Sequence, residues 1–405
     1  MRARWLAVLC SVVALFGCGG DSSPDAGSPD AGSPEHEAFR REITAQIAQG
    51  VILPTLRDFA DRAAALETAT QAYAADPSDT LRAAAQAAWR DAMLVWEQAE
   101  LMQIGPAGMG GTECPVVGGM DLRDEIYSWD LTSECRIDQE TVDQAYADVD
   151  AFAAELVNVR GLDALEYLLF VDTAENDCTD VAPINTDGTW AALGETEITA
   201  RRAAYAHTVA TLVSREAVRL RDLWEPTGGG FATDLATAGE SGSAYPSTQA
   251  AFNDMGGAML YLDVATRDMK VGTTAGISDC LTDTCFDQLE LPHASIDLAA
   301  VLENLRAFQR LYLGEQPGAT GQGWDDLLVA IGAEALAMQL TAAIADAVAA
   351  AEGLGTDSLE TAVAMDRPGV MALYEAMATV QRLFKVDVFT ILDIEPTTCR
   401  IGDND

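Results

Sequence analysis

Two acidic residues stand three positions apart in an otherwise apolar stretch, Gly161-Leu162-Asp163-Ala164-Leu165-Glu166-Tyr167-Leu168-Leu169-Phe170. In a helix, this spacing puts the carboxylates of Asp163 and Glu166 on one side, while leucines cover the other side. Apolar residues around most of the circumference predict a buried helix. A buried carboxylate is costly unless it is paired or binds a cation, so the stretch is a candidate site. The alternative is that arginine side chains neutralise both acids and only hold helices together.

A third acid, Glu100, continues an apolar stripe on an earlier helical region. Trp89 and Trp96 are seven residues apart and Glu100 follows four residues later, so the three share one helix face. Two tryptophans on such a stripe usually belong to a core, which leaves the acid as the unusual member. Oxygen atoms from Asp163, Glu166 and Glu100 are the ligand type that iron, manganese or calcium prefers. The sequence therefore predicts a metal site built from these three acids.

The histidines of the chain do not form a zinc motif. The sequence contains only His36, His207 and His293, and no His-Glu-x-x-His segment. A zinc peptidase site needs histidine nitrogens and a metal-bound water. We expect His36 to be solvated and His207 to be an ordinary helix residue. His293 lies beside Pro292 in a predicted loop and is a candidate for the site. This pattern disfavours peptidase chemistry.

The N-terminus has the features of a lipoprotein signal peptide. A basic start and a short apolar run end at Gly17, directly before Cys18. This order predicts removal of residues 1–17 and acylation of Cys18, and it does not predict a membrane-spanning helix. An ordinary secretory signal with an incidental cysteine is the alternative. Residues 18–36, rich in Ser, Pro, Asp and Gly, predict a flexible acidic tether with a reach of roughly 20 Å.

The expected location and the charge restrict the partners. No aspartate follows Cys18 directly, which by the usual sorting rule favours a lipid-anchored protein of the outer membrane. The chain has 64 acidic and 24 basic residues, a formal net charge of −40. Such a surface repels nucleic acid and anionic lipid, so we expect no nucleic-acid partner and a membrane contact through the lipid anchor. It attracts cations weakly everywhere, so acidity by itself does not indicate a metal site.

Six cysteines remain when the signal peptide and the acylated residue are set aside. An even number in an exported protein predicts disulfides. Cys280–Cys285 is the first expected pair, because it encloses a very short loop. Cys114–Cys135 is the next closest in sequence, and Cys178–Cys399 is the pair that remains. A cysteine metal cluster is not expected, because no cysteine lies beside a histidine.

After the tether, the pattern is helical almost throughout. Alanine is abundant, alternating β-branched residues are scarce, and apolar residues recur at spacings of three and four. One long helical region is expected to bend near Pro54, because proline cannot continue the helical hydrogen-bond pattern. The expected helices are 36–75, 79–103, 138–157, the stretch around Asp163, 195–224, 247–269, 296–313, 323–352, 357–365 and 368–386.

The strongest break in composition is the segment 226–246, PTGGGFATDLATAGESGSAYP. We place a domain boundary there, between an N-terminal helical bundle at 37–226 and a C-terminal helical bundle at 247–405. Residues 104–135 are rich in glycine and form a loop too long for a plain connection, so it is expected to be functional or a packed lid. The predicted fold is therefore all-α, with two tandem helical bundles and long irregular loops.

Several landmarks, taken in order and spacing, resemble the imelysin family. The family signature is Gly-x-His-x-x-Glu, and the matching stretch runs from Gly161 to Glu166, followed by Tyr-Leu-Leu-Phe. The helix that ends at Glu100 also matches, as do Arg123 and Trp129 before the signature. In the second half, Glu-Leu-Pro-His-Ala-Ser at 290–295 resembles a Glu-x-x-x-x-Ser stretch of the family. The resemblance covers roughly residues 37–405.

The resemblance implies a bacterial envelope protein with two helical bundles, in a family tied to iron acquisition. The family was first described as metallopeptidases whose signature His and Glu bind zinc, but the signature His is Asp163 here. An aspartate either keeps a ligand of harder, more acidic character or marks the loss of the metal. In the second case, Arg123 is expected to pair with Asp163 or Glu166 and to leave a salt-bridged core.

The sequence therefore favours a non-enzymatic envelope lipoprotein that binds a metal or another ligand and is linked to iron uptake. Iron or another hard divalent cation is the expected cofactor, and Asp163, Glu166 and Glu100 are the expected ligands. The residues expected around the pocket are Arg123, Trp96, Trp129, Tyr167 and His293. An envelope iron-uptake receptor or transporter is the expected partner. A metallopeptidase and a structural docking lipoprotein without a ligand are the alternatives.

Overall fold

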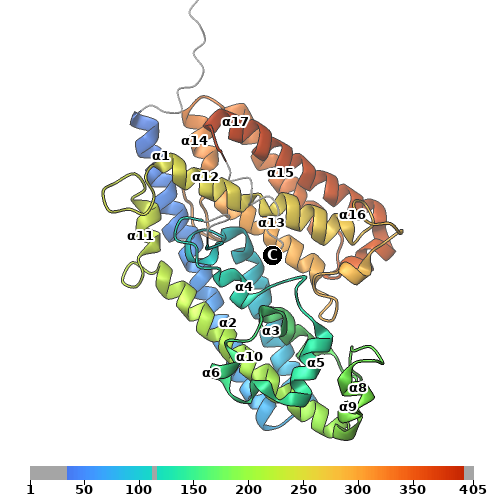
Figure 1. The fold of residues 1–405 in the computed structure, drawn as a ribbon. Coiled ribbons are helices and arrows are strands. Elements are labelled where there is room, and N and C mark those ends of the chain that lie inside the picture. Colours follow the sequence, from blue (N-terminus) through green and yellow to red (C-terminus); the bar gives the residue numbers. More distant parts are fainter. Residues whose placement is uncertain (1–33, 112–115, 396–405) are drawn as a thin grey trace, which may run out of the picture.

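The computed structural model describes residues 34–111 and 116–395 as helices joined by loops (Figure 1). No β-strand occurs in these two ranges, which confirms the predicted all-α class. The predicted signal peptide and Cys18 lie outside the described residues, as do Cys114 and Cys399. The first helix, α1, begins at Pro34, so the predicted tether at 18–36 extends slightly too far.

One long helical region opens the fold, as predicted. It consists of α1 (Pro34–Gln46), the π-helical segment η1 (Ile47–Ile52) and α2 (Leu53–Ala75). Pro54 has no N–H to donate to an earlier carbonyl, and the wider π turn lies directly before it. The predicted irregularity near Pro54 is therefore a local widening of the helix.

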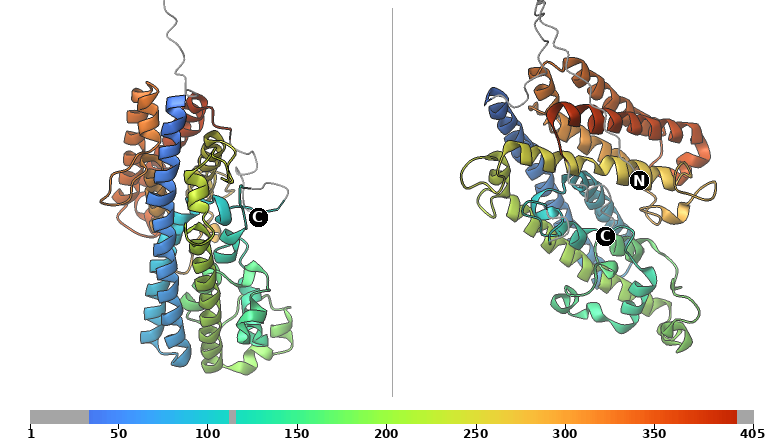
Figure 2. Two further views of the ribbon diagram at one scale, coloured as in Figure 1. Left: turned by 90° about the vertical axis from the view of Figure 1, so that its left-hand side faces the viewer. Right: turned by 45° about the horizontal axis from the view of Figure 1, so that its top comes forward.

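The long helix α2 packs against α3 (Asp79–Ala99) and α10 (Glu195–Trp224). Figure 2 shows these helices running side by side along the length of the molecule. On α3, Trp89, Met93 and Trp96 are buried, as the predicted stripe requires. The helix was predicted to reach residue 103, but it ends at Ala99 and continues as a short 3₁₀ turn, η2 (Glu100–Met102).

Short elements connect α3 to α10 and surround the acidic stretch. The helix predicted at 138–157 is wrong, because the chain there is broken into several pieces. Gln144 adopts a left-handed conformation with φ of 53°, and the Asp148 side chain caps a new helix. The elements of this region are η3 (Gly105–Ala107), α4 (Leu122–Ile126), α5 (Glu134–Asp143), η4 (Ala145–Ala147), α6 (Val149–Phe152), η5 (Val157–Val159), α7 (Leu162–Phe170), α8 (Pro183–Thr186) and α9 (Thr189–Leu193).

The second half of the chain adds a further layer of helices above α2 and α3 in Figure 1. It begins with α11 (Phe231–Ala236) and α12 (Thr248–Met259), and α12 continues as the π-helical segment η6 (Leu262–Thr273). The short turn η7 (Phe286–Gln288) precedes α13 (Asp297–Leu313), which packs against α3.

The helix predicted at 323–352 is two helices, α14 (Trp324–Ala330) and α15 (Glu334–Gly353). They are separated at Gly332, which has φ of 84°. The two helices predicted at 357–365 and 368–386 correspond to the two parts of α16 (Leu359–Gln381), which is interrupted by non-helical backbone at Asp366, two residues before Pro368. The last elements are η8 (Arg382–Val388) and α17 (Phe389–Leu392).

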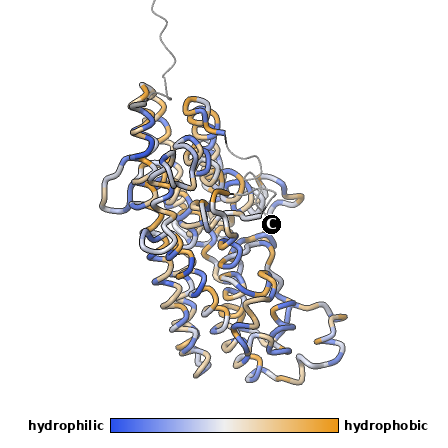
Figure 3. Tube along the Cα trace, turned by 60° about the vertical axis from the view of Figure 1, so that its left-hand side comes forward, coloured by the Kyte–Doolittle hydropathy of each residue, from blue (hydrophilic) through white to orange (hydrophobic). Residues whose placement is uncertain are grey.

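The hydrophobic core is shared by the two halves of the chain. One cluster of buried apolar side chains extends from Ile43 to Ile394 in sequence, and α1 contacts α12 and α14. Figure 3 shows hydrophobic and hydrophilic residues alternating along the helices, as expected for helices with one buried face. Among the described helices, α15 has the length and composition to cross a membrane, but it packs against α13, α14 and α16. The domain boundary at 226–246 remains a prediction.

Two disulfides are present among the described residues. Cys280 pairs with Cys285, as predicted. Cys135 pairs with Cys178, so the predicted pairs Cys114–Cys135 and Cys178–Cys399 are wrong. The sequence distance misled the prediction, because folding brings the start of α5 next to the loop that follows α7. This bond joins two segments that border the acidic stretch.

Candidate functional site

The helix that carries both acids, α7, begins at a position that only glycine tolerates. Gly161 has φ of 97°, and a Cβ there would lie 3.1 Å from the carbonyl oxygen of Ile126 and 3.1 Å from Asp163 Oδ1. The chain therefore passes close to the end of α4 before it enters the helix. This close approach places Asp163 in the first turn, facing the segment that follows α4.

Asp163 is held by hydroxyl and amide donors. Thr132 Oγ1 donates to Asp163 Oδ2 at 2.6 Å, and the N–H and Oγ of Ser128 donate to the same oxygen at 3.2 and 3.3 Å. The carboxylate is 8% exposed. Burial raises the pKa of Asp163 to about 6, although the hydrogen bonds from Thr132 and Ser128 act in the opposite direction.

Glu166 accepts two backbone hydrogen bonds from the loop before α13. The N–H of His293 and the N–H of Ala294 donate to Glu166 Oε1 at 2.9 and 2.7 Å. The side chain is 3% exposed. Burial raises the pKa of Glu166 to about 8, against the smaller lowering effects of the Ala294 amide and His293. Within the described residues, no arginine or lysine forms an ion pair with Asp163 or Glu166.

His293, a candidate from the sequence, lies beside Glu166 and pairs with an acid that the sequence reasoning missed. Its Nε2 lies 2.7 Å from Glu134 Oε1, at the start of α5. Burial lowers the pKa of His293, but the hydrogen bond to Glu134 and the charge of Glu166 outweigh it, so the pKa is raised overall. The ring of Tyr167 packs edge-on against the imidazole, with 5.7 Å between ring centroids. Tyr167 is fixed in turn by donating to Asp138 Oδ2 at 2.7 Å.

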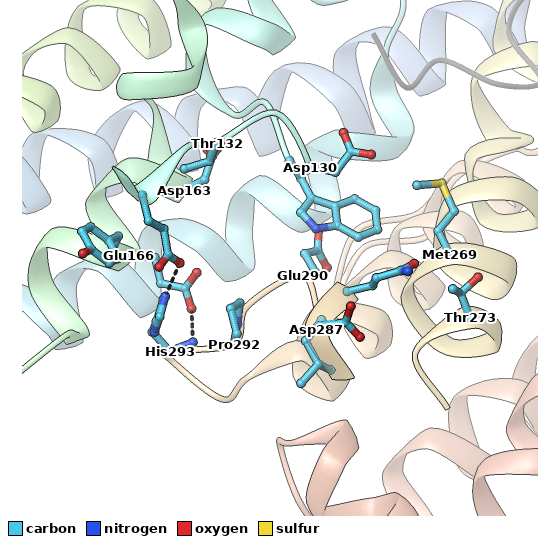
Figure 4. A pocket seen from close by; sticks show the side chains of 15 residues that line it. Asp130, Thr132, Asp163, Glu166, Met269, Thr273, Asp287, Glu290, Pro292 and His293 are labelled. Atoms are coloured by element: carbon cyan, nitrogen blue, oxygen red, sulfur yellow. Dashed lines mark hydrogen bonds and ion pairs between the residues drawn. The ribbon is translucent and has the colours of Figure 1, made fainter. Parts of the chain in front are cut away.

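These residues border a cavity of about 400 Å³ (Figure 4). The cavity lies between α7, the segment after α4, η6 and the loop before α13. Its acidic lining residues are Asp130, Glu134, Asp163, Glu166, Asp287 and Glu290. Its apolar and aromatic lining residues include Trp129, Tyr167, Met269, Leu289 and Pro292. His293 is the one basic side chain in the lining, so the cavity is suited to a ligand with positive charge.

The comparison with known proteins agrees with these landmarks. Residues 52–385 match the family model described as imelysin. The chain belongs to the imelysin family. One solved structure with this fold, from Parabacteroides distasonis, bears the unproven assignment iron-regulated protein A precursor. It is 17% identical with a TM-score of 0.67, over 89% of this chain and 97% of that one. An imelysin-like protein from Psychrobacter arcticum is 16% identical with a TM-score of 0.63, over 90% and 98% of the two chains. At these identities the likeness shows the fold alone. No curated protein shows a significant match.

The structure answers one question that the imelysin signature raises. If Asp163 marked a lost site, Arg123 was expected to neutralise Asp163 or Glu166. Instead, Arg123 pairs with Glu100, with 3.7 Å between Nε and Oε1, and with Asp124, with 2.9 Å between Nη1 and Oδ1. The two acids of the imelysin signature thus border an open cavity and have neutral donors as partners.

Glu100, Arg123 and Trp96 form a separate buried group. Trp96 Nε1 donates to Glu100 Oε1 at 2.8 Å, and the hydroxyl of Tyr261 donates to Glu100 Oε2. None of these residues is among those that line the cavity. Of the expected pocket residues, Trp129, Tyr167 and His293 line the cavity together with Asp163 and Glu166.

The described residues do not fit a metal ion held by protein ligands alone. No group of three or more His, Cys, Asp and Glu side chains in the described ranges is placed to hold one. Asp163 and Glu166 are engaged by donors on different segments, and Glu100 lies in the other group. A resident metal of the kind that the family's zinc description implies therefore finds no complete ligand set here.

A second charged cluster lies behind the cavity, and the sequence reasoning missed it. Lys270 Nζ lies 2.7 Å from Glu97 Oε2 and 2.7 Å from Glu290 Oε1. Tyr127 donates to Glu290 Oε1 at 3.0 Å, and Asn304 donates to Glu97 Oε2 at 2.8 Å. A signal was available, because Lys270 is one of two lysines in the chain and lies between Met269 and Val271.

In this cluster, two carboxylates share one ammonium group. Burial and the charge of Glu97 raise the pKa of Glu290 well above its ordinary value. Burial lowers the pKa of Lys270, but the charges of Glu290 and Glu97 outweigh it, so Lys270 stays protonated. Two buried oxygens, Glu97 Oε1 and Glu290 Oε2, have no hydrogen-bond partner among the described residues. Glu290 belongs to both this cluster and the cavity lining.

Proposed function

We propose that this imelysin-family protein is a non-enzymatic binding protein whose cavity takes a positively charged ligand. The observation that supports the proposal most strongly is the pair Asp163 and Glu166. Both are buried beside a cavity, neither forms an ion pair with an arginine or lysine of the described residues, and the nearby His293 pairs with Glu134. A protein gains nothing in stability from burying such acids, whereas a cationic ligand gains from meeting them in a place that partly excludes water.

The arrangement of the cavity favours a cation that keeps its own hydration shell, chelating ligands or organic groups. The carboxylates surround a space of about 400 Å³ and do not converge on one point. A hydrated metal ion, a chelated metal or an organic cation can occupy such a space, whereas a bare ion needs several oxygens at about 2.0–2.6 Å. Trp129 and Tyr167 supply aromatic walls that attract a cation by their π electrons.

We further propose that the ligand is iron or carries iron. The support is the family, together with the Parabacteroides distasonis neighbour whose assigned name is iron-regulated protein A precursor. Carboxylate oxygens suit the hard ferrous and ferric ions. In this proposal iron is cargo that the protein binds and delivers, with an envelope iron-uptake receptor or transporter as the partner. A lipid anchor at Cys18 would hold the protein in the envelope, and loss of labelled palmitate in Cys18→Ala tests that part.

Calorimetric titration of the full chain tests the proposed function. Ferrous iron under anaerobic conditions, Mn²⁺ and propylammonium serve as probes, in a buffer with physiological salt to screen the acidic surface. We expect saturable binding of at least one probe. Each charge-assisted contact contributes roughly 1.5–3 kcal/mol, so Glu166→Gln with Asp163→Asn should weaken binding at least about tenfold.

The control is a variant with the same change of charge on the exposed face of α16, Glu360→Gln with Glu375→Gln. This variant should bind as tightly as the original protein. Absence of saturable binding, or equal weakening in both double variants, would show that the cavity is not the binding site. Cleavage of an unfolded protein that is abolished by a chelator would instead favour the metallopeptidase alternative.

A further inference from the structure

Glu290 differs from the two signature acids in having a lysine as partner on one oxygen and a buried second oxygen without any partner among the described residues. The residue is 4% exposed and is drawn near the middle of Figure 4. Oε1 is bound by Lys270 at 2.7 Å and by Tyr127 at 3.0 Å. Oε2 is buried and has no hydrogen-bond partner in the described part of the chain. A buried carboxylate oxygen without a donor is rare and calls for a partner.

The local charges show what kind of partner is missing. Lys270 is divided between Glu97 and Glu290, so one ammonium serves two buried carboxylates. Arg123 does not make up the difference, because Glu100 and Asp124 engage it. Ionised together, the two carboxylates exceed the one ammonium, and with its pKa raised well above the ordinary value Glu290 takes up a proton when no cation is bound. A positive centre on a bound ligand would replace that proton and supply the missing positive charge. The ring of Trp129, which lines the cavity, already has Lys270 Nζ 5.9 Å from its centroid.

The position of Glu290 is distinct from that of the two signature acids. Figure 4 shows Asp163, Glu166 and His293 at the left, Glu290 near the middle and Met269 farther to the right. We propose that Glu290 is a second cation-binding position and that the ligand carries two separate positive centres. This inference rests on the proposed function, because it assumes that Asp163 and Glu166 bind the first centre.

The loop before α13 sets the spacing of the two positions. Glu290 and His293 are three residues apart on this loop, and the N–H of His293 donates to Glu166. Three residues span at most about 10 Å, so the loop keeps Glu290 near Glu166 at a limited distance. The chemical class that fits is a linear diammonium ion of short chain length. An iron-bearing ligand of this class would carry an amine beside the chelated metal.

Calorimetric titration with a series of amines tests this inference. The probes are propylammonium, with one charge, and the diammonium ions of ethylenediamine, putrescine and cadaverine. One further charge-assisted contact of roughly 1.5–3 kcal/mol corresponds to a preference of at least about tenfold for the diammonium ion of best length. In Glu290→Gln, this preference should fall to within about twofold.

The matched control is Glu100→Gln. It removes a buried carboxylate of the neighbouring group around Arg123, does not line the cavity, and leaves Lys270 divided between Glu97 and Glu290. The diammonium preference should persist in this variant. Glu290→Gln keeps an acceptor for Lys270 and Tyr127, and Glu97 still neutralises Lys270, so we expect both variants to fold; thermal melting checks this.

Three results would overturn the second position. The first is that the original protein shows no diammonium preference, and the second is that both variants lose the preference equally. The third is that Glu290→Gln loses as much ferrous-iron binding as Glu166→Gln, which would place one ion between the two acids. In each case the proposed function stands as long as a singly charged or metal probe still depends on Glu166. If no probe depends on Glu166, the proposed function itself fails.

Discussion

At the scale of single residues, Asp163 and Glu166 differ in how the fold treats their charge. Asp163 accepts from two side chains and one amide, and its pKa of about 6 leaves it mostly ionised near neutral pH. Glu166 accepts on one oxygen only, and its pKa of about 8 leaves it mostly protonated there. Burial is the main cause in both, so the number of donors decides the difference. The cavity therefore contains one charged and one neutral signature acid when no ligand is bound.

The pKa of Glu166 predicts how stability changes with pH. In the unfolded chain the pKa is about 4.3, and in the folded protein it is about 8. The folded state thus binds more protons between these values, and Glu166 lowers the free energy of unfolding as pH rises from about 4 to about 8. Glu166→Gln removes this loss. The free energy of unfolding of Glu166→Gln minus that of the original protein should therefore be larger at pH 9 than at pH 5, by a few kcal/mol.

Urea denaturation of both proteins at the two pH values measures this change. Glu375→Gln, on the exposed face of α16, is the control for removing one negative charge. All other groups titrate in both proteins, so the difference isolates Glu166. A stability difference that is the same at pH 5 and pH 9 would contradict a raised pKa.

The sequence indicated the acidic pair but not its partners. Asp163 and Glu166 stand out because carboxylates interrupt a helix that is apolar on nearly all sides. Their donors come from Thr132 and from the amide of His293, which lie 31 and 127 residues away in sequence. Local pattern carries no information on which loops close over a helix. For the same reason, Glu100 was placed in the site although it belongs to the group around Arg123.

At the scale of elements, the two disulfides have different consequences for the site. Cys135–Cys178 spans 43 residues and Cys280–Cys285 spans 5. Chain-entropy estimates give a loss of about 4 kcal/mol on removing the first and about 2 kcal/mol on removing the second. Glu134, which pairs with His293, is the neighbour of Cys135. We expect Cys135→Ser with Cys178→Ser to lower both stability and cation affinity.

Thermal melting and calorimetric titration of the two double-serine variants measure these effects. Cys280→Ser with Cys285→Ser serves as the matched comparison, because it also removes one disulfide from a loop. A larger loss of stability from opening the short loop would contradict the expected ranking. Unchanged ligand affinity without Cys135–Cys178 would show that the bond does not position Glu134.

Long helices with a clear apolar period were predictable, whereas their interruptions were not. The sequence indicated α10 at its true bounds, because its period is regular and Pro226 follows it closely. The predicted helix at 138–157 failed because Gln144 takes a left-handed conformation that glycine more often adopts. The π-helical segments, such as η6, also follow from packing, since residue pattern does not distinguish them from α-helix.

At the scale of the whole molecule, one apolar core extends across the predicted boundary at 226–246. Helix α1 contacts α12 and α14, and α3 contacts α13. Because the two halves bury each other's apolar faces, we expect them to unfold together in a single transition by scanning calorimetry. A fragment of residues 37–226 should be largely unfolded. Two separate transitions, or a stably folded fragment, would contradict this expectation and favour independent bundles.

The two halves could be recognised from composition, but the packing of one half against the other could not. The break at 226–246 reads as a linker because it is rich in glycine and polar residues. In the structure it contains α11, which packs against α1 and η1. Which helix faces cover each other depends on shape complementarity between distant segments. The cavity depends on the same union, because its lining comes from both halves of the chain.

The location of a bound cation would show directly whether the cavity is the binding site. Crystals of the full chain can be soaked anaerobically with ferrous iron and measured at the iron absorption edge, where anomalous scattering marks each iron atom. We expect a peak inside the cavity, next to Asp163 and Glu166, that disappears in Glu166→Gln with Asp163→Asn. Iron peaks confined to the acidic outer surface, with none in the cavity, would contradict it.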